Sequence, residues 1–143
     1  MDTKIKFLTD MGANEVSHSG RTLLQHLIEV YNILKLNGAP QHVCDAGLFH
    51  SIYGTSKFKH QTTNDREAVR GVIGARAERL VYEFSILERP RTYHIGELVD
   101  GELRKELTML NGANQIDMNN NEKTPEMTME EAYGHIGYDS GRT

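Results

Sequence analysis

The sequence predicts an all-α protein, a bundle of about five or six helices. Apolar residues recur at three- and four-residue steps in several segments, which is the spacing of one helix face. Glycine and proline stand between these segments, where helices end. No stretch has the sustained apolar and polar alternation of a half-buried strand. At 143 residues the chain is long enough to close a single hydrophobic core.

The first two predicted helices form a pair. Residues from Arg21 to Leu36 have an apolar face at helical spacing, and Gly38 and Pro40 end the helix. A second helix begins at Pro40, because a first turn tolerates the missing N–H of proline, and it runs to about Tyr53. This second segment is apolar on nearly all sides, so we expect it to be the central, buried helix.

A polar loop over residues 54–63 precedes the next helical region. Asn64 and Glu67 have the spacing of a reciprocal helix cap. Gly71 and Gly74 predict that the region divides into two helices.

The end of the chain separates into a last core helix and a tail. The segment ERPRTYH, residues 88–94, predicts a loop, and a last core helix is expected from about Gly101 to Met118. Residues 119–143 are rich in Asn, Glu, Gly and Thr, a composition that cannot offset its ordering entropy alone. We therefore expect a helical domain over residues 1–118 and an acidic tail over 119–143, with one short helix beginning near Thr128.

Composition limits the partners and the compartment. Residues 117–143 hold six acidic and two basic side chains, so they carry the whole net charge of −4, and the other 116 residues hold 14 of each sign. A neutral core without a basic stripe argues against nucleic acid as a partner. A single cysteine, Cys44, and the absence of a signal peptide or a membrane-spanning run predict a soluble, cytoplasmic protein without a membrane partner. The expected partner is a small-molecule ligand, and the sequence leaves a homo-oligomer open.

Two of the seven histidines face the apolar side of predicted helices. His26 lies one turn from Val30, and His50 shares a stripe with the small residues Ala46 and Gly47. Because a short turn joins the two helices, they should pack antiparallel and bring both imidazoles together. Two inward imidazoles suit a transition metal ion, and the alternative is a hydrogen-bonded pair within the core. Exposed or loop positions are expected for His42, His60, His94 and His135.

Two stretches carry a family resemblance. HSGRTLLQHL, residues 18–27, and AGLFHS, residues 46–51, resemble the HD-domain superfamily of metal-dependent helical proteins, and most of all its branch that hydrolyses the alarmone (p)ppGpp. The phrases HSGRTLL, AGLFHSIYGT and GARAERLVYEF are closer still to an uncharacterised HD-like group of bacteria and plants. The resemblance covers roughly residues 14–118 and implies an HD-like bundle in which His26 and His50 are metal ligands.

The sequence departs from that family pattern at the acidic positions. Ser51 stands where the family has the aspartate of its His-Asp pair, and a hydroxyl is a poor ligand for a divalent ion. Gly54 and Thr55 stand where the alarmone hydrolases have an acidic pair. For the distal aspartate of the family, the last helix offers both Asn114 and Asp117, and the choice stays open at this point.

The resemblance implies a site for one divalent transition metal ion, Fe, Mn or Zn, held by His26, His50 and Asp117. Hydrolysis of a phosphoester is the expected chemistry, and iron-dependent oxidation also suits two histidines and one carboxylate. One alternative is a degenerate HD domain with a non-catalytic ligand- or protein-binding role, and another is a scaffold that presents its tail to a partner. The expected pocket is lined by His18, Arg21, Ser51, Tyr53 and Asn114.

Overall fold

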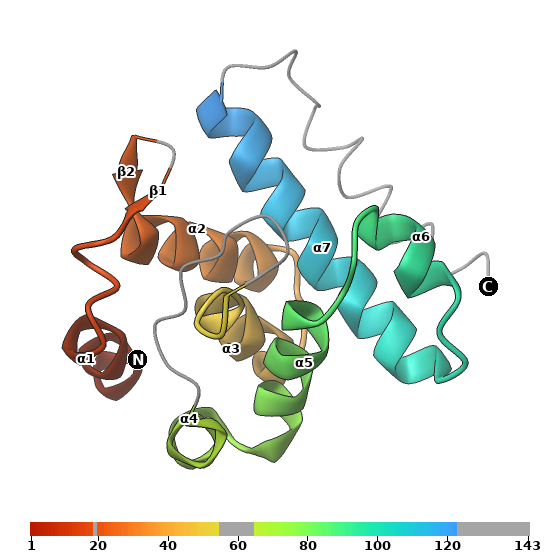
Figure 1. Cartoon of the computed structure of the whole chain (residues 1–143), viewed down its shortest axis with the longest axis horizontal. Coiled ribbons are helices and arrows are strands. Elements are labelled where there is room, and N and C mark those ends of the chain that lie inside the picture. Colours follow the sequence, from red (N-terminus) through yellow and green to blue (C-terminus); the bar gives the residue numbers. More distant parts are fainter. Residues whose placement is uncertain (19, 55–64, 123–143) are drawn as a thin grey trace.

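The computed structural model describes residues 1–18, 20–54 and 65–122 of the chain (Figure 1). This part of the chain contains seven helices and one hairpin of two short strands, which confirms the predicted all-α class. The elements in chain order are α1 (Asp2–Asp10), β1 (Ser17–His18), β2 (Arg21–Thr22), α2 (Leu23–Leu36), α3 (Gln41–Phe49), α4 (Arg66–Ile73), α5 (Ala75–Ser85), α6 (Arg91–Gly96) and α7 (Gly101–Glu122).

A capping box fixes the start of α2. The Thr22 hydroxyl accepts a hydrogen bond from the Gln25 backbone N–H at 3.1 Å, and the Gln25 side chain accepts one from the Thr22 N–H at 2.9 Å. These two bonds satisfy donors that a helix start otherwise leaves unpaired. The box therefore fixes the first turn of α2, which carries His26.

Helix α3 lies at the centre of the bundle, as predicted, and it packs against α2, α5 and α7 (Figure 1). Every residue from Val43 to Phe49 is buried. The helix ends at Phe49, earlier than predicted, and residues 50–53 form a turn. A Cβ on Gly47 would lie 2.5 Å from Leu34 Cδ1 and 3.2 Å from Val30 Cγ1, so side chains of α2 pack directly against the α3 backbone at this glycine.

The region of α4 and α5 corrects two predictions. The cap of α4 is Asp65, whose carboxylate accepts a hydrogen bond from the Ala68 N–H at 3.1 Å, whereas Asn64 lies outside the described residues. The two helices separate at Gly74 alone, where φ is +87°, a conformation that favours glycine. Gly71 lies within α4 and interrupts nothing.

The segments around α6 and α7 also differ from the sequence predictions. Residues 91–96 form α6, although the segment was predicted as a loop, because six residues are too few to show a helical period. Helix α7 continues past Met118 to Glu122, into the predicted tail, and the short helix predicted near Thr128 lies outside the described residues. The β1–β2 hairpin, which pairs Ser17 with Thr22, is too short to have a strand pattern.

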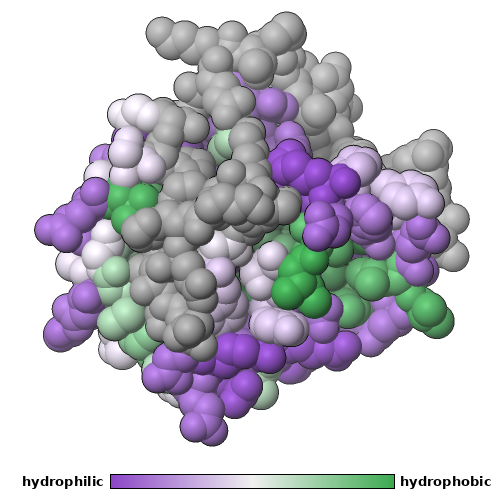
Figure 2. Space-filling view, in the orientation of Figure 1, coloured by the Kyte–Doolittle hydropathy of each residue, from purple (hydrophilic) through white to green (hydrophobic). Residues whose placement is uncertain are grey.

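The visible surface is mixed, with an apolar patch on the side where α5, α6 and α7 lie (Figure 2). Among the exposed apolar side chains, Val99, between α6 and α7, is 97% exposed, and Ile86, directly after α5, is 54% exposed. Among the described residues, no helix is both long and apolar enough to cross a bilayer. The predicted homo-oligomer stays a prediction.

We expect Gly47→Ala to lower the free energy of unfolding by about 1–3 kcal/mol, because the added methyl displaces two enclosed side chains of α2. Gly71→Ala is the matched control, since a Cβ there meets no atom within 4 Å. It should raise stability by about 0.5–1 kcal/mol through helix propensity. Urea unfolding measures both effects, and equal stability changes in the two variants would contradict close packing at Gly47.

Candidate functional site

Two buried imidazoles meet between α2 and α3. His26 and His50 are each 1% exposed, and their Nε2 atoms lie 3.2 Å apart. The rings are nearly perpendicular, with centroids 5.0 Å apart. The antiparallel packing predicted from the short connecting turn thus brings the start of α2 to the end of α3.

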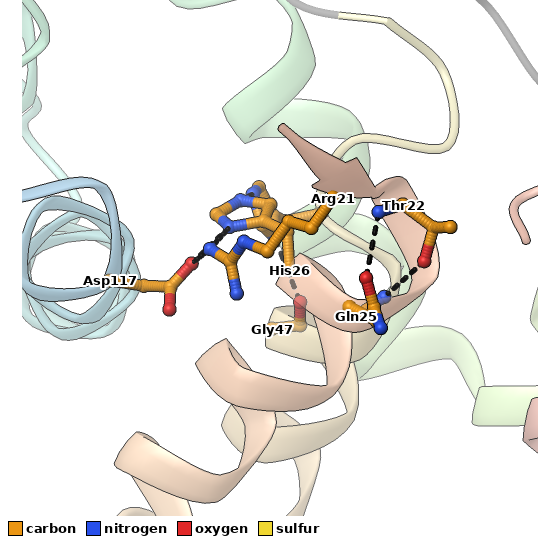
Figure 3. A network of polar contacts seen from close by, with 7 residues as sticks. Arg21, Thr22, Gln25, His26, Gly47 and Asp117 are labelled. Atoms are coloured by element: carbon orange, nitrogen blue, oxygen red, sulfur yellow. Dashed lines mark hydrogen bonds and ion pairs between the residues drawn. The ribbon is translucent and has the colours of Figure 1, made fainter. Parts of the chain in front are cut away.

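Each ring also has an acceptor on its outer nitrogen. His26 Nδ1 donates to the Asp117 carboxylate at 2.5 Å, and His50 Nδ1 donates to the Gly47 carbonyl oxygen at 2.8 Å (Figure 3). Neither a carboxylate nor a carbonyl oxygen has a proton to donate, so both Nδ1 atoms carry one. These two contacts favour a proton on Nδ1 of each ring, although Arg21 Nη2, which can only donate, also lies 3.4 Å from His26 Nδ1.

The protonation of both Nδ1 atoms bears on the contact between the two Nε2 atoms. A neutral imidazole protonated on Nδ1 has a lone pair on Nε2. Two neutral rings would therefore direct lone pairs at each other across 3.2 Å, which is repulsive. A proton carried by one of the two Nε2 atoms would make this contact a hydrogen bond.

Asp117 is the carboxylate that α7 supplies to this cluster. It is 2% exposed, and its Oδ2 accepts from both His26 Nδ1 and Arg21 Nη2 (Figure 3). Burial alone would raise the pKa of Asp117, but the hydrogen bonds and charges of His26 and Arg21 outweigh it, so this pKa lies below its ordinary value. Asp117, and not Asn114 one turn earlier on α7, is the residue in contact with His26.

The contact of Asp117 differs from the predicted direct ligation. Its oxygen meets His26 Nδ1, whereas His50 faces the opposite nitrogen of the same ring. In keeping with this, the described part of the chain contains no group of three or more His, Cys, Asp or Glu side chains placed to hold a metal ion. The three-ligand site stays a prediction that requires Asp117 to turn away from Nδ1.

The other predicted pocket residues divide between this cluster and other parts of the fold. Arg21 joins the cluster through Asp117, and His18 lies in β1. Ser51 is 3% exposed in the turn that follows α3, next to His50. Tyr53 does not join the histidines by its hydroxyl, because that group donates to Glu78 at 2.9 Å.

Glu78 is the centre of a second polar cluster, which is buried at the carboxylate. It is 1% exposed, and it accepts from Arg66 Nε at 2.7 Å, Arg66 Nη2 at 2.9 Å and Arg70 Nη2 at 3.4 Å. Burial tends to raise the pKa of Glu78, but the bonds from Arg66 and Tyr53 lower it overall. For Tyr53, burial and the Glu78 carboxylate both raise the phenol pKa. Arg66 and Arg70 are therefore both engaged by the Glu78 carboxylate.

His42 corrects another prediction. It was expected at an exposed position, but its Nε2 donates to Glu106 on α7 at 2.5 Å, and Arg76 of α5 donates to the same carboxylate at 3.3 Å. Helix α7 crosses both α3 and α5 here, so a side chain on the apparent polar side of α3 becomes part of an interface. Of the other histidines predicted as exposed, His94 is half-buried, and His60 and His135 lie outside the described residues.

The comparisons with known proteins give a family. A family model described as Domain of unknown function (DUF6817) matches residues 7–89, more than half of the chain. The chain belongs to this family. The DUF6817 segment contains both His26 and His50, and it ends before Arg91 and Asp117. Neither the curated proteins nor the solved structures gave a match.

Replacing Glu78 tests the second cluster through its pH dependence. We expect Glu78→Gln to lower the free energy of unfolding at pH 7 by about 1–3 kcal/mol, a range limited by the partial exposure of the arginine ends. The Glu78 pKa is lower in the folded protein than its ordinary value of 4.5, so its stabilisation is present above that pH and is lost as the pH falls through the folded pKa.

The difference between the wild type and Glu78→Gln should therefore shrink below about pH 4. Urea unfolding between pH 7 and pH 3 measures this difference. Glu88→Gln, at an exposed position, is the control and should change stability by less than about 0.5 kcal/mol at either pH. A difference for Glu78→Gln that stays constant down to pH 3 would show that the charge of Glu78 is not its cause.

Proposed function

We propose that this chain is an HD-domain-like protein that holds one divalent transition metal ion between His26 and His50 and acts there on a small molecule. The observation that carries the proposal is the pair of buried Nε2 atoms, 3.2 Å apart, with both Nδ1 atoms engaged by acceptors. The resemblance to HD-domain proteins favours a metal ion over a shared proton. Hydrolysis of a phosphoester is the first candidate reaction, and iron-dependent oxidation is the second.

The distance between the two nitrogens fits ligands of one ion. Zinc–imidazole bonds are about 2.0–2.1 Å long, so two nitrogens at angles between octahedral and tetrahedral lie about 2.8–3.4 Å apart. The observed 3.2 Å falls in this range. Imidazole nitrogen suits Fe, Mn and Zn, and when bound such an ion lowers the pKa of a coordinated water or polarises a substrate oxygen.

The surrounding residues have supporting roles under this proposal. A carboxylate that accepts from the outer nitrogen of a metal-binding histidine fixes the ring orientation and raises its basicity. Asp117 stands in that position for His26, and the Gly47 carbonyl does so for His50. Arg21 holds Asp117 in place and keeps it ionised.

A second candidate is a degenerate HD domain that binds a ligand or a protein without turnover. Two observations favour it: Ser51 replaces the carboxylate of the His-Asp pair, and the described residues lack a three-ligand group. The two candidates differ in turnover, so phosphoester hydrolysis by the metal-loaded protein distinguishes them.

We expect purified protein to bind one transition metal ion per chain, and His50→Ala to abolish this binding because one of two imidazole ligands is lost. His42→Ala is the matched control, since His42 lies on the same helix and pairs with Glu106. Elemental analysis and cobalt titration measure the stoichiometry. Asp117→Asn should weaken the affinity by about 10- to 100-fold, as for other outer-sphere carboxylates. Two tightly bound ions per chain, or full binding by His50→Ala, would refute the site.

We expect no useful hydrolysis of (p)ppGpp, even with added manganese. The acidic pair that follows the His-Asp position in the alarmone hydrolases is replaced by Gly54 and Thr55, and a placed acid or base contributes about 10²- to 10⁴-fold. A nucleotide-release assay with the metal-loaded protein measures this. Turnover comparable to that of the hydrolases would show that other groups supply the proton transfer.

A further inference from the structure

Arg91, the first residue of α6, is a buried cation without a counter-charge. It is 6% exposed, and its guanidinium carbon lies 4.4 Å from the centroid of the Phe84 ring. Its Nε is buried and has no hydrogen-bond partner, and no carboxylate in the described ranges forms an ion pair with it. A cation–π contact returns only part of the free energy that burying a charge costs.

The buried carboxylates of the described residues show a different arrangement. Asp117 is paired with Arg21 and His26, and Glu78 with Arg66. Glu106 and Asp45 likewise have a cationic side chain within ion-pair distance, Arg76 and Lys4 respectively. Arg91 instead has a like charge nearby, and burial together with Arg89 lowers its pKa to about 10. It is therefore still protonated at neutral pH, with its charge unbalanced.

The position of Arg91 connects it to the histidine pair. The Phe84 ring contacts both the Arg91 guanidinium and the His50 ring. The centroids of the Phe84 and His50 rings lie 5.4 Å apart in an edge-to-face arrangement. The next residue, Thr92, contacts Asn111 of α7 at 3.5 Å, and Asn111 Oδ1 is also buried without a partner. Two buried polar atoms without a partner, Arg91 Nε and Asn111 Oδ1, thus belong to the packed helices α6 and α7.

We propose that Arg91 is the anchor of an anion-binding site where α5, α6 and α7 meet, and that it binds the oxyanion of a small-molecule ligand. The planar guanidinium donates two parallel N–H bonds to a phosphate or a carboxylate, which balances the buried charge. A hydroxyl on the same ligand would donate to Asn111 Oδ1. This anion-binding site would define the ligand class of the proposed function. Only one part of it rests on the proposed function, namely that the same ligand also reaches His26 and His50.

The test measures anion binding in the metal-free protein. Chelator-treated protein is titrated with inorganic phosphate, sulfate and acetate, with sodium chloride at equal ionic strength as the reference, and the melting temperature and the heat of binding are recorded. We expect at least one oxyanion to raise the melting temperature above the chloride reference. A response to phosphate and sulfate alone assigns a tetrahedral oxyanion, and a response to acetate alone assigns a carboxylate.

The variants assign that response to Arg91. Arg91→Met should weaken the oxyanion affinity roughly tenfold or more and should keep or raise the melting temperature of the free protein, because it removes an unbalanced buried charge. Arg91→Lys keeps the positive charge but lacks the planar guanidinium. This variant should fold, and it should bind the oxyanion more weakly than the wild type does. Arg89→Gln, two residues away at an exposed position, is the control and should keep the response.

Three results would overturn the proposal: no oxyanion stabilises the wild type above chloride, Arg91→Met keeps the response, or Arg89→Gln loses it as completely as Arg91→Met does. The metal proposal is tested separately by the same variants. His50→Ala should keep the oxyanion response while losing the metal, and Arg91→Met should keep the metal. If one proposal fails, the other can therefore still be tested, because oxyanion binding and metal binding are measured separately.

Discussion

The close contact between α2 and α3 at Gly47 is the constraint on which the site depends. Gly47 faces Val30 and Leu34 at a distance that leaves no room for a side chain. From this contact, one helical turn along α3 leads to His50, and one turn back along α2 leads to His26. In an antiparallel pair these two steps run in the same direction in space, so the imidazoles meet. The glycine thus determines both how near the helices lie and which residues face each other.

Carboxylates on α5 and α7 then link these later helices to the earlier part of the bundle. Asp117 and Glu106 on α7 accept hydrogen bonds from side chains of the β2–α2 region, α3 and α5. Glu78 on α5 accepts them from α4 and from the turn after α3. Removing one partner of such a buried pair exposes the other to the full desolvation cost. The hydrogen bonds of Asp117 and Glu106 are directional, so they restrict how α7 is rotated against α2, α3 and α5.

The parts that the sequence predicted are those that depend on local pattern. The helical period and the short turn at Gly38 were sufficient to place His26 opposite His50, because both follow from neighbouring residues. The choice between Asn114 and Asp117 depends on the rotation of α7, which contacts far along the chain determine. Helix α6 has too few residues for a period, and Arg91 is conspicuous only once its surroundings are known. The position of His42 was predicted wrongly for a related reason, since its partner Glu106 comes from another helix.

The charge of the interior connects the two proposals. In the cluster of Arg21, His26, His50 and Asp117, the Asp117 carboxylate accepts from both Arg21 and His26. The metal ion or shared proton proposed between the two imidazoles would add a positive charge in this buried region. Arg91 adds another beyond the Phe84 ring that also contacts His50. With little water to screen them, these charges favour an anionic ligand and disfavour a cationic one, whichever species the imidazoles share. A phosphorylated or carboxylated small molecule would therefore lower the electrostatic free energy of the whole region, and not only that of its own contacts.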